Sequence, residues 1–233
     1  MLRRVESKNM GSSELGWLSS KFHFSFADYY NPKNINFGVL RVINDDYIQP
    51  NTGFDTHPHR DMEIVTYVVD GELTHGDSMG NKRTLTRGQM QYMSAGTGVY
   101  HSEHNYGNNI LRTLQIWIFP DKHGYEPNYG DYRFEWRDRK NKWLHMVSGT
   151  KGNAQIKVNQ DINIYSLELE KNKSIEFEVE VGRQAYLVQI EGESSVNKVE
   201  LKQRDGMEII EENFLLEANE VSHIIIFEMA KPF

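Results

Sequence analysis

The feature of this chain that most constrains its fold is a series of short runs rich in Val, Ile, Tyr and Phe, separated by clusters of Gly, Asn and Asp. Runs of this kind are typical of β-strands, and the clusters between them, such as Asn44-Asp45-Asp46, are typical of turns. Short strands with regular turns form barrels or sandwiches. We therefore predict an all-β protein, with strands in its first half over residues 36–43, 63–70, 84–85, 89–93 and 112–119.

A second block of the chain repeats the first in outline, since Asp70-Gly71-Glu72 has a counterpart in Glu191-Gly192-Glu193. Self-similarity of this kind predicts an internal duplication, although common turn sequences also recur by chance. The stretch 120–142 shows no clear period and is interpreted as the connection between two halves, with room for a short helix. We predict two domains, residues 1–135 and residues 136–233.

The composition argues against several classes of partner. Acidic and basic residues are interspersed and the net charge is -7, so no basic stripe is available to neutralise phosphates. We therefore expect no direct nucleic-acid binding. No apolar stretch approaches the roughly 20 residues that a membrane helix needs, and residues 1–6 lack the apolar core of a secretion signal. We expect a cytoplasmic protein that is a monomer and does not contact membranes.

Two pairs of potential metal ligands stand out: His57 and His59 are separated by one residue, and so are His101 and Glu103. Side chains two residues apart on a β-strand point to the same side, so two such strands can bring four donors together. The chain has no cysteine, which leaves imidazole and carboxylate as the available ligands. Such a set suits divalent transition-metal ions. We predict that these four residues bind one divalent metal ion.

The residues around these pairs resemble the two signature motifs of the cupin barrels. The first motif is approximated by Gly53, His57, His59, Glu63 and Gly71, and the second by Gly88, Gly96, His101 and Asn105. Two departures point to one branch of the cupins. Ser94-Ala95 stands in place of the usual proline, and four residues rather than two separate Gly96 from His101.

Within the cupins the chain resembles the pirin family. The resemblance is carried by three strings in the same order as in that family, SFADYY at 25–30, HPHRDME at 57–63 and GTGVYHSE at 96–103. It is dense from about Leu15 to Trp117 and thinner beyond. The resemblance implies two stacked cupin (jelly-roll) barrels, of which only the N-terminal one carries metal. It favours Fe(II), while Mn, Co, Ni, Cu and Zn are also compatible with the ligand set.

The second half lacks the ligand pairs. Counting without gaps from Gly71 to Gly192 places glutamates where the first half has His57 and His59, and counting from Gly88 places Asn219 and Val221 where it has His101 and Glu103. We therefore predict a C-terminal barrel without metal ligands.

The pirin resemblance implies two functions of different classes. The first is a quercetin 2,3-dioxygenase, in which the metal binds a small aromatic substrate such as a flavonol, O2 cleaves its heterocyclic ring, and Glu103 acts as the catalytic base. The second is a non-catalytic regulatory protein that senses metal or redox state and binds another protein. A metal-dependent isomerase or a sugar-binding cupin is a third alternative, because this fold hosts many chemistries.

Other polar residues near the motifs receive structural or supporting roles. Glu63 is interpreted either as an acceptor for a ligand imidazole N–H or as a strand-edge carboxylate. We expect His104 on the opposite face of its strand and Asn105 closing a turn. His75 is interpreted as a residue of a surface turn, with a donor near the pocket rim as the alternative. The aromatic residues of segment 22–30 are expected to fill the core rather than to cover the barrel mouth.

Overall fold

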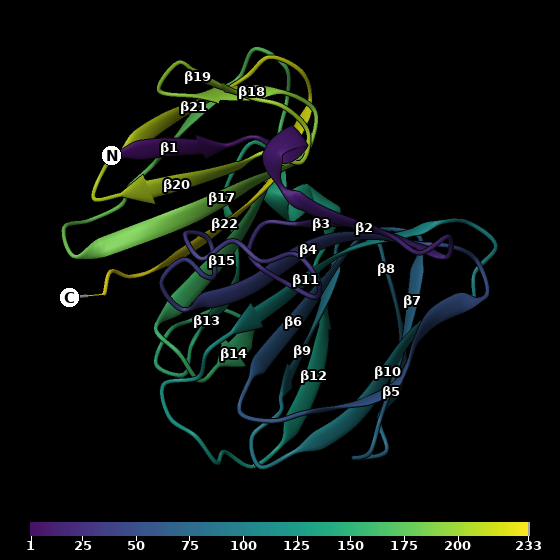
Figure 1. The fold of residues 1–233 in the computed structure, drawn as a ribbon. Coiled ribbons are helices and arrows are strands. Elements are labelled where there is room, and N and C mark those ends of the chain that lie inside the picture. The colour runs from purple at the N-terminus through teal and green to yellow at the C-terminus, as the bar shows by residue number, and fades with distance from the viewer. Residues whose placement is uncertain (233) are drawn as a thin grey trace. The chain divides into compact units, whose positions relative to one another are not determined.

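The computed structural model describes residues 1–232 and consists almost entirely of β-strands (Figure 1). The chain forms two compact units. The N-terminal barrel comprises Gly11–Phe134 and Val158–Gln160, and the C-terminal barrel comprises Met1–Met10, Glu135–Lys157 and the chain from Asp161. The prediction of an all-β protein with two barrels is confirmed. No helix within residues 1–232 is long and apolar enough to cross a membrane.

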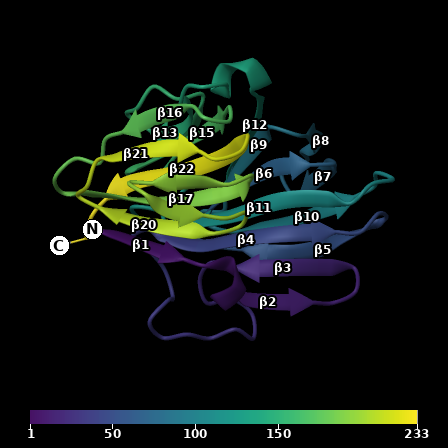
Figure 2. The same cartoon turned by 90° about the horizontal axis from the view of Figure 1, so that it is seen from above.

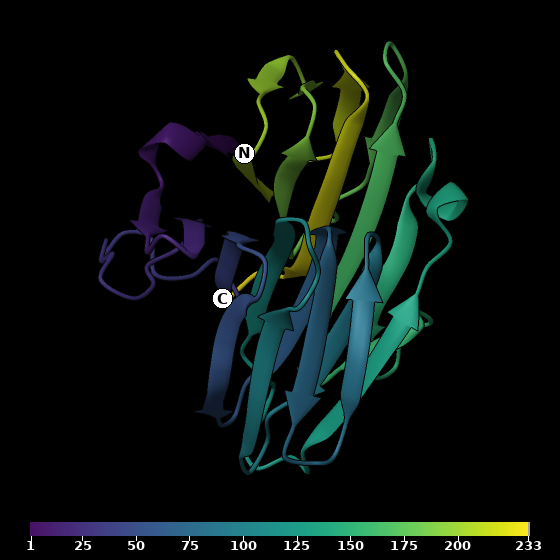
Figure 3. The same cartoon turned by 90° about the vertical axis from the view of Figure 1, so that its right-hand side faces the viewer.

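The N-terminal barrel consists of a seven-stranded and a four-stranded antiparallel sheet. The larger sheet has the order β12-β9-β6-β11-β4-β3-β2, and the smaller has the order β5-β10-β7-β8. Figure 3 shows the four strands of the smaller sheet side by side, in shades of blue and teal. The strands of the larger sheet are β2 (Gly11–Glu14), β3 (Leu18–Phe22), β4 (Leu40–Ile48), β6 (Glu63–Asp70), β9 (Gln89–Ser94), β11 (Leu111–Ile118) and β12 (Asn128–Arg133). Those of the smaller sheet are β5 (Thr52–His59), β7 (Glu72–Asp77), β8 (Lys82–Thr86) and β10 (Val99–Asn105).

The C-terminal barrel repeats this arrangement, with sheet orders β1-β20-β17-β22-β15-β13-β14 and β16-β21-β18-β19. The strands of its larger sheet are β1 (Leu2–Val5), β13 (Leu144–Gly149), β14 (Ile156–Val158), β15 (Ile162–Leu169), β17 (Arg183–Glu191), β20 (Gly206–Ile210) and β22 (Ser222–Ala230). Those of its smaller sheet are β16 (Ser174–Phe177), β18 (Ser194–Val196), β19 (Val199–Leu201) and β21 (Phe214–Ala218). The shared order of the central strands supports the predicted internal duplication.

The division of the chain differs at its N-terminus from the predicted division into residues 1–135 and 136–233. In the sequence, the boundary between the two units lies between Phe134 and Glu135. Strand β1, however, belongs to the C-terminal barrel, where it pairs with β20 (Figure 2). The pairing is strengthened by Arg4, whose guanidinium donates to the carboxylate of Asp205 at 2.6 Å. A pairing between segments some 200 residues apart leaves no local pattern in the sequence.

One other prediction for local structure was wrong, and another was incomplete. The cluster Asn44-Asp45-Asp46 was expected to be a turn, but it lies buried in the middle of β4. Asp45 is stable there because Arg112 on the neighbouring strand binds its carboxylate with two hydrogen bonds of 2.9 and 2.8 Å. The stretch 120–142 contains the short 3-10 helix η2 (Trp136–Arg139), and it also contains the unexpected strand β12. This edge strand is largely exposed on both faces, so its sequence does not alternate.

The interiors of the two barrels differ in chemistry. Inside the C-terminal barrel a large cluster of buried apolar side chains from both sheets fills the space, including Leu187, Met207 and Ile226. Inside the N-terminal barrel, buried His101, Glu103 and other polar side chains lie among the apolar ones. Burying a polar group costs free energy unless the group is paired or binds a ligand. The N-terminal barrel is therefore the candidate location of a functional site.

Candidate metal centre

The predicted ligand pairs lie on adjacent antiparallel strands of the four-stranded sheet. His57 and His59 are on β5 and His101 and Glu103 are on β10, with His57 directly opposite His101. The register shifts between His101 and Glu103, because Glu103 pairs with Phe54. Such a bulge redirects the side chains on either side of it. The strands therefore bring the two pairs to one side of the sheet, as their spacing predicts.

Three imidazoles converge inside the barrel. The ring centroids of His57, His59 and His101 are 4.5 to 4.9 Å apart, and one nitrogen from each ring lies within 4.8 Å of the others. His57 Nδ1 lies 2.8 Å from the carbonyl oxygen of Asp55, which can only accept a hydrogen bond, so Nδ1 carries the proton. The lone pair of His57 is then on Nε2, which is 3.1 Å from His101 Nε2.

Burial keeps the imidazoles of His59 and His101 neutral. Removal from water lowers the pKa of His59 to about 4 and that of His101 to about 3, and the neighbouring histidines lower both pKa values further. At neutral pH both rings therefore have a nitrogen lone pair to offer. Neutral imidazole is the form that binds metal ions.

Glu103 lies next to this cluster but is not equally close to all of its members. One of its carboxylate oxygens is within 4.8 Å of donor nitrogens of both His101 and His75. Its side chain is buried, and it accepts hydrogen bonds from Thr66, Gln91 and Gln115. The structure thus joins the three predicted imidazoles in one cluster, and it joins Glu103 to that cluster through His101.

His75 is a member of the site that sequence reasoning missed. It was expected in a surface turn, but it lies fully buried on β7, opposite Glu103. Its Nε2 lies 2.9 Å from a carboxylate oxygen of Asp77, and its ring stacks on Tyr129 with centroids 4.4 Å apart. The sequence did hold a signal, because His75 and Asp77 are a third pair separated by one residue.

Glu63 does not support a ligand imidazole, so that interpretation was wrong. Strand β5 ends at His59 and β6 begins at Glu63, and Asp61 between them has a φ of 48°. Because the strand is interrupted, the two-residue period does not extend to Glu63. Its carboxylate instead accepts hydrogen bonds from Ser94 Oγ at 2.6 Å and from the backbone N–H of Asn159 at 3.0 Å.

Two other predictions for β10 are confirmed. His104 alternates with His101 and Glu103 and lies on the other face, where its ring stacks on Tyr106 with centroids 5.2 Å apart. Asn105 closes the following turn, since its side-chain oxygen accepts a hydrogen bond from the backbone N–H of Gly107 at 3.0 Å.

A cavity of about 520 Å³ opens onto the imidazole cluster. His57, His59 and Glu103 line it together with Gln115. The rest of its wall includes the aromatic rings of Trp17, Phe22, Phe26, Phe54 and Trp117, for which we call it the aromatic cavity, together with polar side chains such as Asn44 and Asp46. Phe22 and Phe26 thus face a cavity, although their segment was expected to fill the core. Phe24 of the same segment is buried, in line with that expectation.

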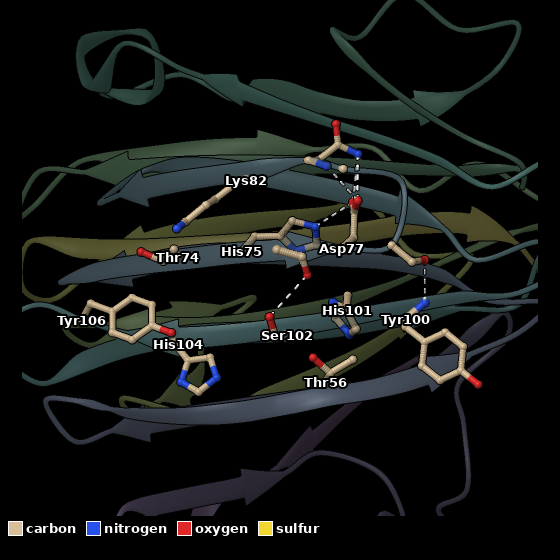
Figure 4. A pocket seen from close by; sticks show the side chains of 14 residues that line it. Thr56, Thr74, His75, Asp77, Lys82, Tyr100, His101, Ser102, His104 and Tyr106 are labelled. Atoms are coloured by element: carbon tan, nitrogen blue, oxygen red, sulfur yellow. Dashed lines mark hydrogen bonds and ion pairs between the residues drawn. The ribbon is translucent and has the colours of Figure 1, made fainter.

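A second hollow of about 520 Å³ lies over the opposite face of β10 (Figure 4). Tyr100, Ser102 and His104, which alternate with the ligand pair, line it. Figure 4 shows the hydroxyls of Thr56, Thr74 and Ser102 between the rings of Tyr100 and Tyr106. This hollow is open, and His75 and His101 are among its lining residues, whereas His57, His59 and Glu103 line the aromatic cavity.

The donor set fits a divalent metal ion. Neutral imidazole nitrogens and a carboxylate, without thiolate, match the preferences of borderline transition metals. Glu103 is buried and accepts hydrogen bonds from neutral side chains, an environment in which a nearby cation would stabilise its carboxylate. The N-terminal barrel therefore holds a His/Glu cluster able to bind a metal.

Two jelly-roll barrels, one of them carrying such a cluster on two adjacent strands, define a bicupin. A family model described as Pirin matches residues 4–118, and one described as the quercetinase C-terminal cupin domain matches residues 145–229. The chain belongs to the pirin family.

Relatives of known name support this assignment. A pirin-like protein of Caulobacter vibrioides is 40% identical over 232 residues, covering 99% of this chain and 100% of its own. The quercetin 2,3-dioxygenase of Escherichia coli K12 is 38% identical over 231 residues, covering 98% of this chain and 99% of its own. The structure of the bacterial pirin YhhW of Escherichia coli in complex with nickel(II) superposes with a TM-score of 0.93 at 36% identity, covering 100% of each chain.

Proposed function

We propose that this protein is a metal-dependent dioxygenase of the pirin type that cleaves a flavonol such as quercetin with O2. The observation that carries the proposal is the aromatic cavity, which has His57, His59 and Glu103 in its wall. Substrate sites are typically concave and apolar, with a few polar groups placed to orient the ligand. A planar polyphenol suits such a wall, because its rings can pack against aromatic side chains while its oxygens reach the polar cluster.

His57, His59 and His101, together with Glu103, would hold the metal. Fe(II) is the favoured ion, and Mn, Co, Ni, Cu or Zn would also fit these donors. The nickel complex of the relative YhhW supports metal binding in the family, and it does not single out the metal used here. When bound, the ion supplies Lewis acidity for substrate oxygens and the means to react with O2.

The protein's own residues would bind and orient the substrate. The rings of Trp17, Phe54 and Trp117 would exclude water from the flavonol and hold its plane. Glu103 would accept the proton of the substrate 3-hydroxyl at Oε2, which accepts one hydrogen bond, from Gln115, whereas Oε1 accepts two. Proton transfer to a positioned carboxylate accelerates a reaction by roughly 10²–10⁴-fold.

The names of relatives agree with this activity, since the Escherichia coli relative is called a quercetin 2,3-dioxygenase. A cytoplasmic location and a monomeric state remain predictions from the sequence. A metal- or redox-sensing protein that binds another protein is the alternative. An aromatic cavity beside the predicted metal ligands favours the enzyme, because a sensor needs no such space.

The test is dioxygen uptake by protein that has been loaded anaerobically with Fe(II) and then given quercetin. We expect uptake that matches flavonol loss and carbon monoxide release in the intact protein, and none in His59→Ala at the same protein concentration. Absence of uptake at full iron occupancy would reject quercetin as substrate and favour the regulatory alternative.

A further inference from the structure

We infer that Gln115 is the positioning residue that aims a single oxygen of Glu103, Oε2, at the metal cluster. The inference deepens the proposed function and assigns a role to a side chain outside the four ligand positions. It rests on the hydrogen bonds of one buried carboxylate and on the place of Gln115 in the cavity wall.

The two oxygens of Glu103 have different surroundings. Oε1 accepts hydrogen bonds from Thr66 Oγ1 at 2.8 Å and from Gln91 Nε2 at 2.7 Å, which uses both of its lone pairs. Oε2 accepts a hydrogen bond from Gln115 Nε2. One lone pair of Oε2 is therefore left for a cation or a substrate hydroxyl, and the carboxylate can offer only one oxygen.

The amide of Gln115 is held in one orientation. Its nitrogen end must face Glu103, because a carboxylate can only accept a hydrogen bond. Its oxygen end lies 3.0 Å from Thr66 Oγ1, whose one proton is donated to Glu103 Oε1. Gln115 is directly opposite Thr66 on the adjacent strand β6, so the backbone register itself sets this contact.

The two glutamine donors act from different sides. Gln115 lines the aromatic cavity, two residues before Trp117 on the same face of β11. Gln91 is buried on β9 and does not line that cavity, and its own oxygen accepts a hydrogen bond from the hydroxyl of Tyr129 at 3.2 Å. Gln91 therefore donates to Oε1, whose two lone pairs are both occupied, whereas Gln115 donates to Oε2 from the wall of the aromatic cavity.

The experiment compares Gln115→Met with Gln91→Met, because each removes one amide N–H from the same carboxylate. Both proteins are loaded with Cu(II), and their electron paramagnetic resonance spectra report the donors around the ion. We expect altered g and hyperfine values in Gln115→Met, where Oε2 loses the hydrogen bond that orients it. We expect a spectrum like that of the intact protein in Gln91→Met, where Thr66 still donates to Oε1 and Gln115 to Oε2. Unchanged spectra in both variants, or the same change in both, would overturn the inference.

Turnover provides a second readout. With Fe(II) and quercetin we expect kcat to fall about 10–100-fold in Gln115→Met, as for misplaced catalytic groups, with KM changed much less, and a smaller fall in Gln91→Met. If the intact protein does not consume quercetin, the proposed function fails, but the Cu(II) spectra still decide the role of Gln115.

Thr66 provides a second control on the other oxygen. Thr66→Val removes the proton donated to Oε1 at nearly constant volume, while Thr66→Ser keeps it. Both variants should keep a Cu(II) spectrum close to that of the intact protein, because Gln115 still donates to Oε2. A change in Thr66→Val as large as the change in Gln115→Met would contradict the inference.

Discussion

His57 and His101 lie directly opposite each other on β5 and β10, with their Nε2 atoms 3.1 Å apart. His57 Nε2 offers a lone pair toward His101, because its other nitrogen is bound to the carbonyl of Asp55. A cation bound among the nitrogens of these two imidazoles and of the neighbouring His59 would stabilise the cluster. The tautomer of His57 is thus set by the backbone two residues earlier in the same strand.

Replacement of His59 by Ala should abolish stable metal binding. The loss of affinity should exceed the roughly 10–100-fold that removal of an outer hydrogen-bond partner costs, since a direct donor is lost. Metal content after dialysis and calorimetric titration measure it. His104→Ala is the matched control because His104 lies on the opposite face of the sheet, and it should retain full metal content. Equal loss in the two variants would show that the effect is structural.

Replacement of Glu103 by Ala should damage turnover more than metal binding. If Glu103 accepts the substrate proton, kcat should fall about 10²–10⁴-fold, while the three imidazoles retain much of the metal affinity. Steady-state oxygen uptake and metal titration on the same preparation separate the two effects. Metal loss as large as that of His59→Ala would leave Glu103 with the role of a ligand only.

Replacement of Gly53 by Ala should disturb the ligand strand. A Cβ at Gly53 would lie 2.4 Å from the carbonyl oxygen of Glu103 and 2.5 Å from the Cα of His104, so β10 would have to move. We expect a destabilisation of about 1–3 kcal/mol and weaker metal binding, measured by urea unfolding and metal titration.

Gly76→Ala in the same sheet is the control for this change. A Cβ there would meet only Ser102 Oγ, at 3.4 Å, so the substitution should change stability by less than about 1 kcal/mol. A Gly53→Ala protein as stable and as metal-loaded as Gly76→Ala would show that β5 and β10 can separate without cost.

The C-terminal barrel should lose stability as the pH falls below about 6.5. Burial lowers the pKa of His145 below its ordinary value of 6.5, although its contact with Asn163 partly opposes this. The unfolded chain therefore binds a proton at a higher pH than the folded one does. The stabilisation is complete above pH 6.5 and is lost as the pH falls toward the folded-state pKa.

His145→Phe should reduce this loss, since it removes the titrating group and keeps an aromatic ring against Tyr165. Urea unfolding midpoints at about pH 7.5 and about pH 5.5 measure the difference. His123, whose side chain is 85% exposed, provides the control His123→Gln, which should keep the pH dependence of the intact protein. An unchanged pH dependence in His145→Phe would exclude His145 as its source.

Local patterns predicted much of the fold. The apolar run at 63–70 coincides with β6, and the glycine turns that repeat between the two halves agree with the shared strand order of the two barrels. Local patterns failed where a buried polar residue is paired with a residue that is distant in the sequence. Asp45 looks like a turn residue and lies in a strand because Arg112 neutralises it.

The sequence by itself determined the all-β class, the duplication and the candidate donors, because each of these depends on a period or spacing along a few neighbouring residues. Only the tertiary structure decided which donors meet. The interruption after His59 takes Glu63 away from the cluster, while strand pairing brings His75 beside Glu103 and the amides of Gln91 and Gln115 onto its two oxygens. These contacts join residues from separate strands, and their geometry is set by register and bulges that no single stretch of the chain encodes.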